Sequence, residues 1–118
     1  MTTIEWLCGA FMAVLMGSSA LVHLFQPRLT DPFIPDFLPK PLAHWFAAMA
    51  ELTLAIGIFI PPYRNLALQG TVLLMLLFLP LHIRDVVIKQ PAIGSRIAAW
   101  IRLPIQFVFM AMAWYAMA

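Results

Sequence analysis

Long apolar stretches alternate with short polar or proline-rich connections along this chain of 118 residues. Four stretches, at about residues 4–25, 42–60, 66–83 and 97–118, contain few charged side chains. A helix needs about 20 apolar residues to cross a hydrocarbon core about 30 Å thick, so each stretch approaches the required length. The pattern predicts an all-α fold, a polytopic membrane protein in which four transmembrane helices form an antiparallel bundle, with residues 1–118 as a single domain.

The composition supports a membrane location. The chain is 64% hydrophobic and 10% charged, whereas soluble domains are about 45–50% apolar and about 25% charged. We therefore expect the lipid bilayer as its surroundings and attribute the basic pI of about 9.1 to residues that flank the spans, not to a nucleic-acid partner. The lone cysteine, Cys8, excludes an internal disulfide, and no metal site is expected.

The three connections between the stretches differ in length and character. Pro61 and Pro62 end the second stretch, because proline cannot continue a helix, and the short link that they begin requires an antiparallel hairpin. Residues 26–41 contain five prolines among apolar side chains, so we expect a folded lid and not a free linker. Residues 84–96 are more polar, and Ser95 is a suitable N-cap for a following helix.

Lysine and arginine are distributed unequally between the two ends of the predicted bundle. The end with the two long connections carries Arg28, Lys40, Arg84, Lys89 and Arg96. The hairpin end carries Arg64 alone. The positive-inside rule then predicts that the long connections are cytoplasmic and that both termini lie outside, in a cell membrane of the bacterial inner-membrane type.

Five polar side chains within the apolar stretches form the candidate site. Glu51 lies in the middle of the second stretch, where a charged acid costs about 2.5–3.5 kcal/mol unless it faces protein or water. His23 and His82 end the first and third stretches at the long-connection end. Arg102 and Gln106 are four residues apart near the start of the fourth stretch, so they share a helix face. We expect these five side chains to converge in one leaflet.

The charges favour a specific pair within this cluster. Burial alone disfavours an ionised Glu51, while a nearby arginine favours it. We therefore expect an ionised Glu51 paired with Arg102, with Gln106 and one histidine completing the hydrogen bonds. The alternative is a protonated Glu51 that donates to His23 or His82.

Two further polar residues are expected outside the cluster. His44 follows the proline-rich connection, and we expect it to anchor its helix at the interface, although it shares a helical stripe with Ala47 and Glu51. Asp85 stands next to Arg84, and we expect the two to form a solvated loop pair.

Motifs on the four stretches resemble those of the DoxX-like four-helix membrane proteins, over nearly the whole chain. The motifs are Ala20-Leu21-Val22-His23-Leu24, Ala50-Glu51-Leu52, Phe78-Leu79-Pro80-Leu81-His82-Ile83 and Arg102-Leu103-Pro104-Ile105-Gln106. They are similar to the Gly-x-x-His-Phe, Glu-containing, Phe-Pro-Ala-Asn-Ile and Arg-x-Pro-x-Gln patterns of that family. The chain departs from the family pattern where His82 replaces the usual asparagine and where Ala20 or Ser19 replaces a glycine.

The resemblance implies an accessory subunit of a membrane oxidoreductase, with no activity of its own expected and its catalytic residues unassigned. We expect the polar cluster to bind a quinone or a similar amphipathic molecule, with other membrane-protein subunits or further copies of the chain as partners. Two alternatives remain. In the first, the cluster only holds the helices together in a purely structural helix-bundle subunit. In the second, His23 and His82 ligate a haem between two helices.

Overall fold

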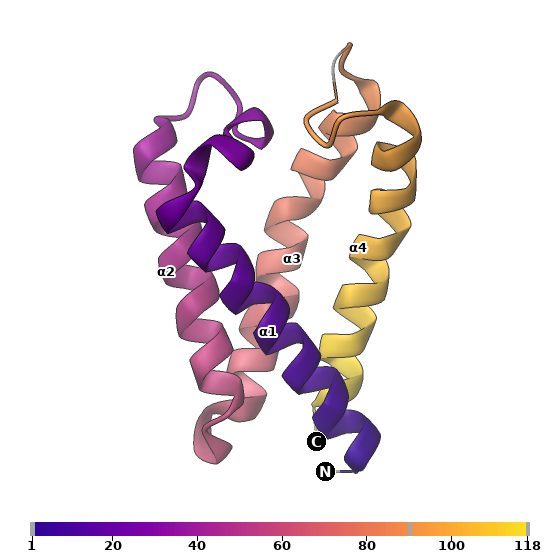
Figure 1. The fold of residues 1–118 in the computed structure, drawn as a ribbon. Helices are drawn as coiled ribbons and strands as arrows, with labels where there is room; N and C mark the ends of the chain where they lie inside the picture. The colour runs from indigo at the N-terminus through magenta and orange to yellow at the C-terminus, as the bar shows by residue number, and fades with distance from the viewer. Residues whose placement is uncertain (1, 90, 118) are drawn as a thin grey trace.

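The computed structural model describes residues 2–89 and 91–117. Within these residues, four long helices are joined by three connections (Figure 1). The helices are α1 (Thr3–Phe25), α2 (Lys40–Ile58), α3 (Arg64–Val87) and α4 (Arg96–Ala116). Each of them is long and apolar enough to cross a membrane, and they pack antiparallel. The predicted all-α, four-helix transmembrane fold is confirmed.

Local sequence signals set the beginnings of two helices. At the start of α1, the Thr2 hydroxyl accepts from the Glu5 amide at 3.1 Å, and the Glu5 carboxylate accepts from the Thr2 amide at 3.4 Å. This reciprocal capping box satisfies two of the amides that a helix N-terminus leaves without partners. At the start of α4, the Ser95 hydroxyl accepts from the Ala98 amide at 3.1 Å, as expected for an N-cap.

The hairpin between α2 and α3 is short and tightly closed. Helix α2 ends at Ile58, and Pro61–Tyr63 forms a single 3₁₀ turn before α3 begins. The Arg64 side chain folds back, and its Nε donates to the Ile58 carbonyl at 2.9 Å. A free carbonyl at the α2 C-terminus thereby gains a donor, which holds the two helices at a fixed spacing.

Helix α3 continues past residue 83, where the predicted third span ends, and its last turn contains a buried charged residue, Asp85. The side chain of Asp85 is 2% exposed, so the prediction of a solvated pair with Arg84 was wrong. Its carboxylate accepts from the backbone amides of Ala92 and Ile93. Arg96 ties the same connection together by donating to two carbonyls at the end of α3, those of Val86 and Ile88.

The four helices form two pairs that separate toward one end of the molecule. Helix α1 packs mainly against α2, and α3 mainly against α4. The pairs converge at the end that carries both termini and the α2–α3 hairpin, and they diverge toward the two longer connections (Figure 1). At the converging end the core is dense, with Met12, Leu68 and Ala116 fully buried. The diverging end is where the polar side chains of the sequence collect.

The first long connection folds back over the diverging end. It contains two 3₁₀ turns, η1 (Pro27–Leu29) and η2 (Asp31–Phe33), and the side chain of Ile34 that follows them is 8% exposed. Lys40 at the start of α2 donates to the Ile34 carbonyl at 3.3 Å. The proline-rich segment is therefore an ordered cover, as its apolar composition predicts.

Candidate functional site: an intramembrane polar cavity

A cavity of about 700 Å³ lies between the two helix pairs at their diverging end. All four helices and the first long connection contribute to its walls, which are mostly apolar. Its polar lining consists of Ser19, His23, Thr30, Glu51, His82 and Arg102. A volume of this size lies within the range of about 300–1,000 Å³ that is usual for small-molecule sites, and mostly apolar walls with a few convergent polar groups are typical of them.

On the α1–α2 side of the cavity, Glu51 is 3% exposed and takes its partners from α1. The Ser19 hydroxyl donates to the Glu51 carboxyl group at 3.2 Å, and His23 Nε2 lies 3.6 Å from the same oxygen. Within residues 2–89 and 91–117, Glu51 and Arg102 form no ion pair, so the predicted pairing was wrong. The reason is the pairwise packing of the helices, which sets α1 against Glu51 and leaves α4 across the cavity. The alternative partner, His23, is the one in contact.

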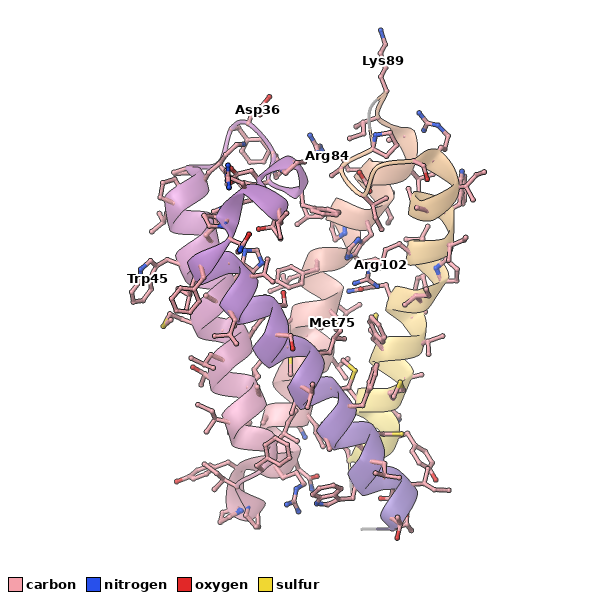
Figure 2. The ribbon with its side chains drawn as sticks, viewed as in Figure 1. Asp36, Trp45, Met75, Arg84, Lys89 and Arg102 are labelled. Carbon is pink, nitrogen blue, oxygen red and sulfur yellow. The ribbon has the colours of Figure 1, made fainter. Side chains whose placement is uncertain are left out.

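On the α3–α4 side, Arg102 reaches from α4 into the space between the helix pairs (Figure 2). Its guanidinium carbon lies 5.1 Å from the centroid of the Phe109 ring, close enough for a cation–π contact. Arg102 Nη1 and His82 Nδ1 are both buried without a hydrogen-bond partner in the described part of the chain. His82 also meets the ring of Phe33 edge-on, with centroids 6.3 Å apart.

These unpaired nitrogens are informative because buried polar atoms in folded proteins nearly always have partners. Leaving a buried donor unsatisfied costs about 1–3 kcal/mol, and more for a charged group. Arg102 and His82 both line the cavity, so a molecule that occupies the cavity can supply the missing hydrogen-bond partners.

Gln106 belongs to the protein interior and not to the cavity wall. It is 0% exposed, and its Nε2 donates to the Met75 carbonyl at 3.0 Å. Met75, labelled in Figure 2, lies toward the middle of the bundle. Gln106 therefore bridges α4 and α3 and is separated from the Glu51 contacts where we had expected it.

Besides Ser19, the structure adds three residues to the site that the sequence analysis did not place there. The prediction of an interfacial anchor at His44 was wrong, because its side chain is 6% exposed. Its Nδ1 lies 2.8 Å from His23 Nδ1, and its Nε2 lies 2.6 Å from Asp31 Oδ1. The Thr30 hydroxyl is 3.3 Å and 3.4 Å from the two Nδ1 atoms. The helical stripe shared by His44 and Glu51 was a signal that could have placed His44 in the site. The positions of Asp31 and Thr30 depend on how the connection folds, so no sequence pattern indicates them.

This network of imidazoles and carboxyl groups is not arranged around a metal. Among the residues that the structure describes, no group of three or more histidine, cysteine, aspartate or glutamate side chains is placed to hold a metal ion. The ring nitrogens of His23 and His44 instead face one another and the two carboxyl groups. The arrangement is a linear chain of contacts that ends in the cavity.

Residues 12–117 match the family described as Domain of unknown function (DUF8561). The chain belongs to this family. The match includes every residue that lines the cavity. No curated protein and no solved structure matches the chain. The comparisons do not assign it to the DoxX-like proteins, so that resemblance stays a prediction, and the function has to be argued from the cavity.

Proposed function

We propose that this DUF8561 protein binds a small amphipathic molecule with a polar ring, a quinone or a close chemical analogue, in the cavity between its helix pairs. The observation that carries the proposal is the pair of buried, unpartnered nitrogens, Arg102 Nη1 and His82 Nδ1. Arg102 and His82 line the same cavity as Glu51.

A quinone ring suits this distribution of polar groups. Its carbonyl oxygens accept hydrogen bonds, which the guanidinium of Arg102 provides, and which His82 provides in the tautomer that carries the proton on Nδ1. A hydroxyl or carbonyl at the other end of the ring would meet the carboxyl group of Glu51, which lines the opposite wall. The remaining walls are apolar, with Phe46, Phe78, Leu15 and Leu81 among the lining side chains, and these suit a ring face and an isoprenoid tail.

Equilibrium binding of a radiolabelled short-chain ubiquinone to the protein in lipid nanodiscs tests the proposal. We expect saturable binding by the wild type and a loss of about tenfold in affinity for Arg102→Gln, equivalent to about 1.4 kcal/mol. Glu51→Gln is expected to weaken binding as well. Arg28→Gln is the matched control, because Arg28 is exposed at the same end of the molecule. Absence of saturable binding by the wild type, or equal affinities for all of these proteins, refutes the proposal.

A purely structural role is the second candidate, and the Gln106–Met75 hydrogen bond between α4 and α3 favours it. In that case Arg102→Ala lowers the yield of an assembled complex in co-purification without a change in ligand affinity. A haem held by His23 and His82 is less favoured. Both ring nitrogens of His23 face protein partners, which leaves neither directed at an iron, and purified protein is expected to lack a Soret band.

We also propose the setting in which this site operates. Residues 1–118 act as one domain in a bacterial-type inner membrane, with the long connections cytoplasmic and both termini outside. In support, the basic residues predicted to be cytoplasmic, such as Arg84 and Lys89, lie together at the diverging end (Figure 2). The proposed partners are other membrane subunits or further copies of the chain. The resemblance to DoxX-like proteins implies that such subunits would belong to an oxidoreductase.

A further inference from the structure

We propose that Asp31, His44, His23 and Glu51 form a proton relay that connects the surface of the diverging end with the cavity. The proposal rests on the proposed function, because the relay would exchange protons with the ligand bound in the cavity. It gives a function to the three contacts that join these residues, which ligand binding alone does not require.

The relay runs from an accessible group to a buried one through three contacts. Asp31, in the first long connection, has a side chain that is 38% exposed, whereas Glu51 is 3% exposed. The contacts between them are 2.6 Å from Asp31 Oδ1 to His44 Nε2, 2.8 Å from His44 Nδ1 to His23 Nδ1, and 3.6 Å from His23 Nε2 to Glu51 Oε1. Each histidine thus uses one ring nitrogen toward the surface and the other toward the cavity.

The donor and acceptor roles along this chain are tied together. A neutral imidazole has one nitrogen that donates and one that accepts, and the two facing Nδ1 atoms need one proton between them. If His44 donates from Nε2 to an ionised Asp31, its Nδ1 accepts from His23 Nδ1, and His23 Nε2 accepts from a protonated Glu51. If Asp31 is protonated, every role reverses, and His23 Nε2 donates to an ionised Glu51.

One proton shift in each contact converts the second arrangement into the first. The Asp31 proton moves to His44 Nε2, the proton on His44 Nδ1 moves to His23 Nδ1, and the proton on His23 Nε2 moves to Glu51. The net result is the transfer of one proton from Asp31 to Glu51. Both imidazoles are neutral before and after, so no charge is left on a buried ring, and the number of protons is unchanged.

The last contact is the slowest part of the path. At 3.6 Å it exceeds the range of a side-chain hydrogen bond, so transfer requires the two groups to approach by about 0.5 Å. The cavity on one side of Glu51 leaves room for a small rotation of its side chain. The Ser19 hydroxyl, which donates to the same carboxyl oxygen, orients Glu51 toward α1.

Other charged groups around the relay are compatible with proton delivery. Helices α3 and α4 contribute His82 and Arg102 to the far wall of the cavity, and neither contacts Glu51 as an ion pair within the described residues. The carboxyl group of Glu51 is therefore free to exchange its proton. A cavity ligand whose ring gains or loses a proton would exchange it with Glu51. The relay would restore the proton from the surface once both imidazoles have returned to their starting tautomers, because one transfer leaves the proton of each ring on the nitrogen that must accept the next.

Time-resolved infrared spectroscopy of the protein in liposomes tests the relay directly. A light-released caged proton lowers the pH, and the carbonyl stretch of protonated Glu51 is followed and assigned by its loss in Glu51→Gln. We expect His44→Gln to slow this protonation about 100-fold, within the range seen when a positioned proton-transfer group is removed. Asp31→Asn, at the partly exposed entrance, is expected to slow it as well, which guards against a folding defect in the His44 variant.

Asp36→Asn is the control, because Asp36 lies in the same connection with a fully exposed carboxylate. Wild-type rates in both His44→Gln and Asp31→Asn would overturn the relay, as would the absence of any Glu51-dependent band between about pH 4 and about pH 9. Ubiquinone binding measured on the same samples keeps the two proposals apart. Slowed protonation without quinone binding supports the relay and refutes the proposed ligand.

Discussion

Glu51 is buried in the middle of an apolar helix, and its surroundings show how a membrane helix accommodates a carboxyl group. The Ser19 hydroxyl and the His23 ring contact one oxygen, and the opposite side faces the cavity. A charge in the apolar part of a membrane is tolerated where it finds partners or a polar cavity. Glu51 has both, which separates it from residues such as Gln106 that are enclosed by protein.

The enclosed Gln106 provides a test at the scale of one hydrogen bond. Replacing it with methionine removes the donor to the Met75 carbonyl while keeping a similar volume. We expect the free energy of unfolding to fall by about 0.6 kcal/mol and at most about 1.7 kcal/mol, the range for hydrogen bonds between membrane helices. Unfolding by steric trapping in bicelles measures it.

Gln69→Met is the control for this substitution, because Gln69 is exposed on α3. It should leave the free energy of unfolding within about 0.5 kcal/mol of the wild type, as surface substitutions usually do. A larger loss for Gln69→Met than for Gln106→Met would contradict the assignment of Gln106 as a bridge.

The identities of the site residues were more predictable from the sequence than their pairings. Ionisable side chains in apolar stretches are few, so His23, Glu51, His82 and Arg102 stand out, and all four line the cavity. Which of them touch depends on how the helices pair, and periodicity within one helix carries no information on that. The partnership of Glu51 with α1 instead of Arg102 is a consequence of helix packing.

At the scale of elements, close approach between α2 and α3 depends on small residues. A Cβ atom added at Gly57 would lie 2.9 Å from the Cβ of Ala67, closer than two such atoms approach. Neither backbone can move away easily, because the hairpin is fixed by the Arg64–Ile58 hydrogen bond. Small residues at such crossings are how membrane helices gain packing contacts.

Gly57→Ala is therefore expected to destabilise the protein by about 1–3 kcal/mol through overpacking. A decrease in the thermal midpoint in detergent, followed by circular dichroism, checks this expectation. Gly9→Ala is the matched control, since its added Cβ would meet Ile58 and Ala116 at 3.6 Å and 3.7 Å, ordinary contact distances. The double variant Gly57→Ala with Ala67→Gly should recover most of the loss, and a double variant no better than Gly57→Ala would argue against this contact.

The connection between α3 and α4 yields a second test at this scale. Asp85→Ala removes the acceptor for the amides of Ala92 and Ile93. Those amides should exchange hydrogen about tenfold faster or more, as expected from a local loss of about 1.4 kcal/mol. Hydrogen-exchange mass spectrometry resolves this segment, and Asp36→Ala, with its fully exposed side chain, should leave it unchanged. Unchanged exchange in Asp85→Ala would mean that the carboxylate does not hold the connection.

The helices themselves were accessible to sequence reasoning because length and hydropathy decide whether a segment can cross a membrane. The observed helix ends differ from the predicted ones by a few residues where a helix continues beyond its apolar segment. Helix α3 continues to Val87, past the apolar limit at residue 83, because Asp85 is satisfied by the following connection. Hydropathy indicates which residues can lie in the hydrocarbon core, whereas hydrogen bonding determines where the helix ends.

At the scale of the whole molecule, the two ends of the bundle differ in charge and in openness. Both long connections and the cavity lie at one end, and both termini lie at the other (Figure 1). The proposed orientation places the entrance of the relay, Asp31, on the cytoplasmic side. The orientation therefore decides from which compartment protons would be taken.

Labelling with a membrane-impermeant maleimide tests this orientation. Single cysteines are introduced by Asp36→Cys, Lys89→Cys or Tyr63→Cys in a Cys8→Ala background, at positions that are exposed in the structure. Intact cells are expected to label the Tyr63 variant alone, and inverted vesicles the other two. Labelling of the Asp36 and Lys89 variants in intact cells would reverse the proposed topology and place the entrance of the relay outside.

The dense packing where the helices converge restricts how the cavity can be supplied. Met12, Leu68 and Ala116 are fully buried there, so among the described residues the core at that end is closed by side chains. A ligand of the proposed kind partitions into lipid, so we expect it to enter from the lipid monolayer that borders the long connections. The protein would sample the contents of that monolayer only, and the rate at which its ligand flips across the bilayer would limit how quickly an empty cavity refills.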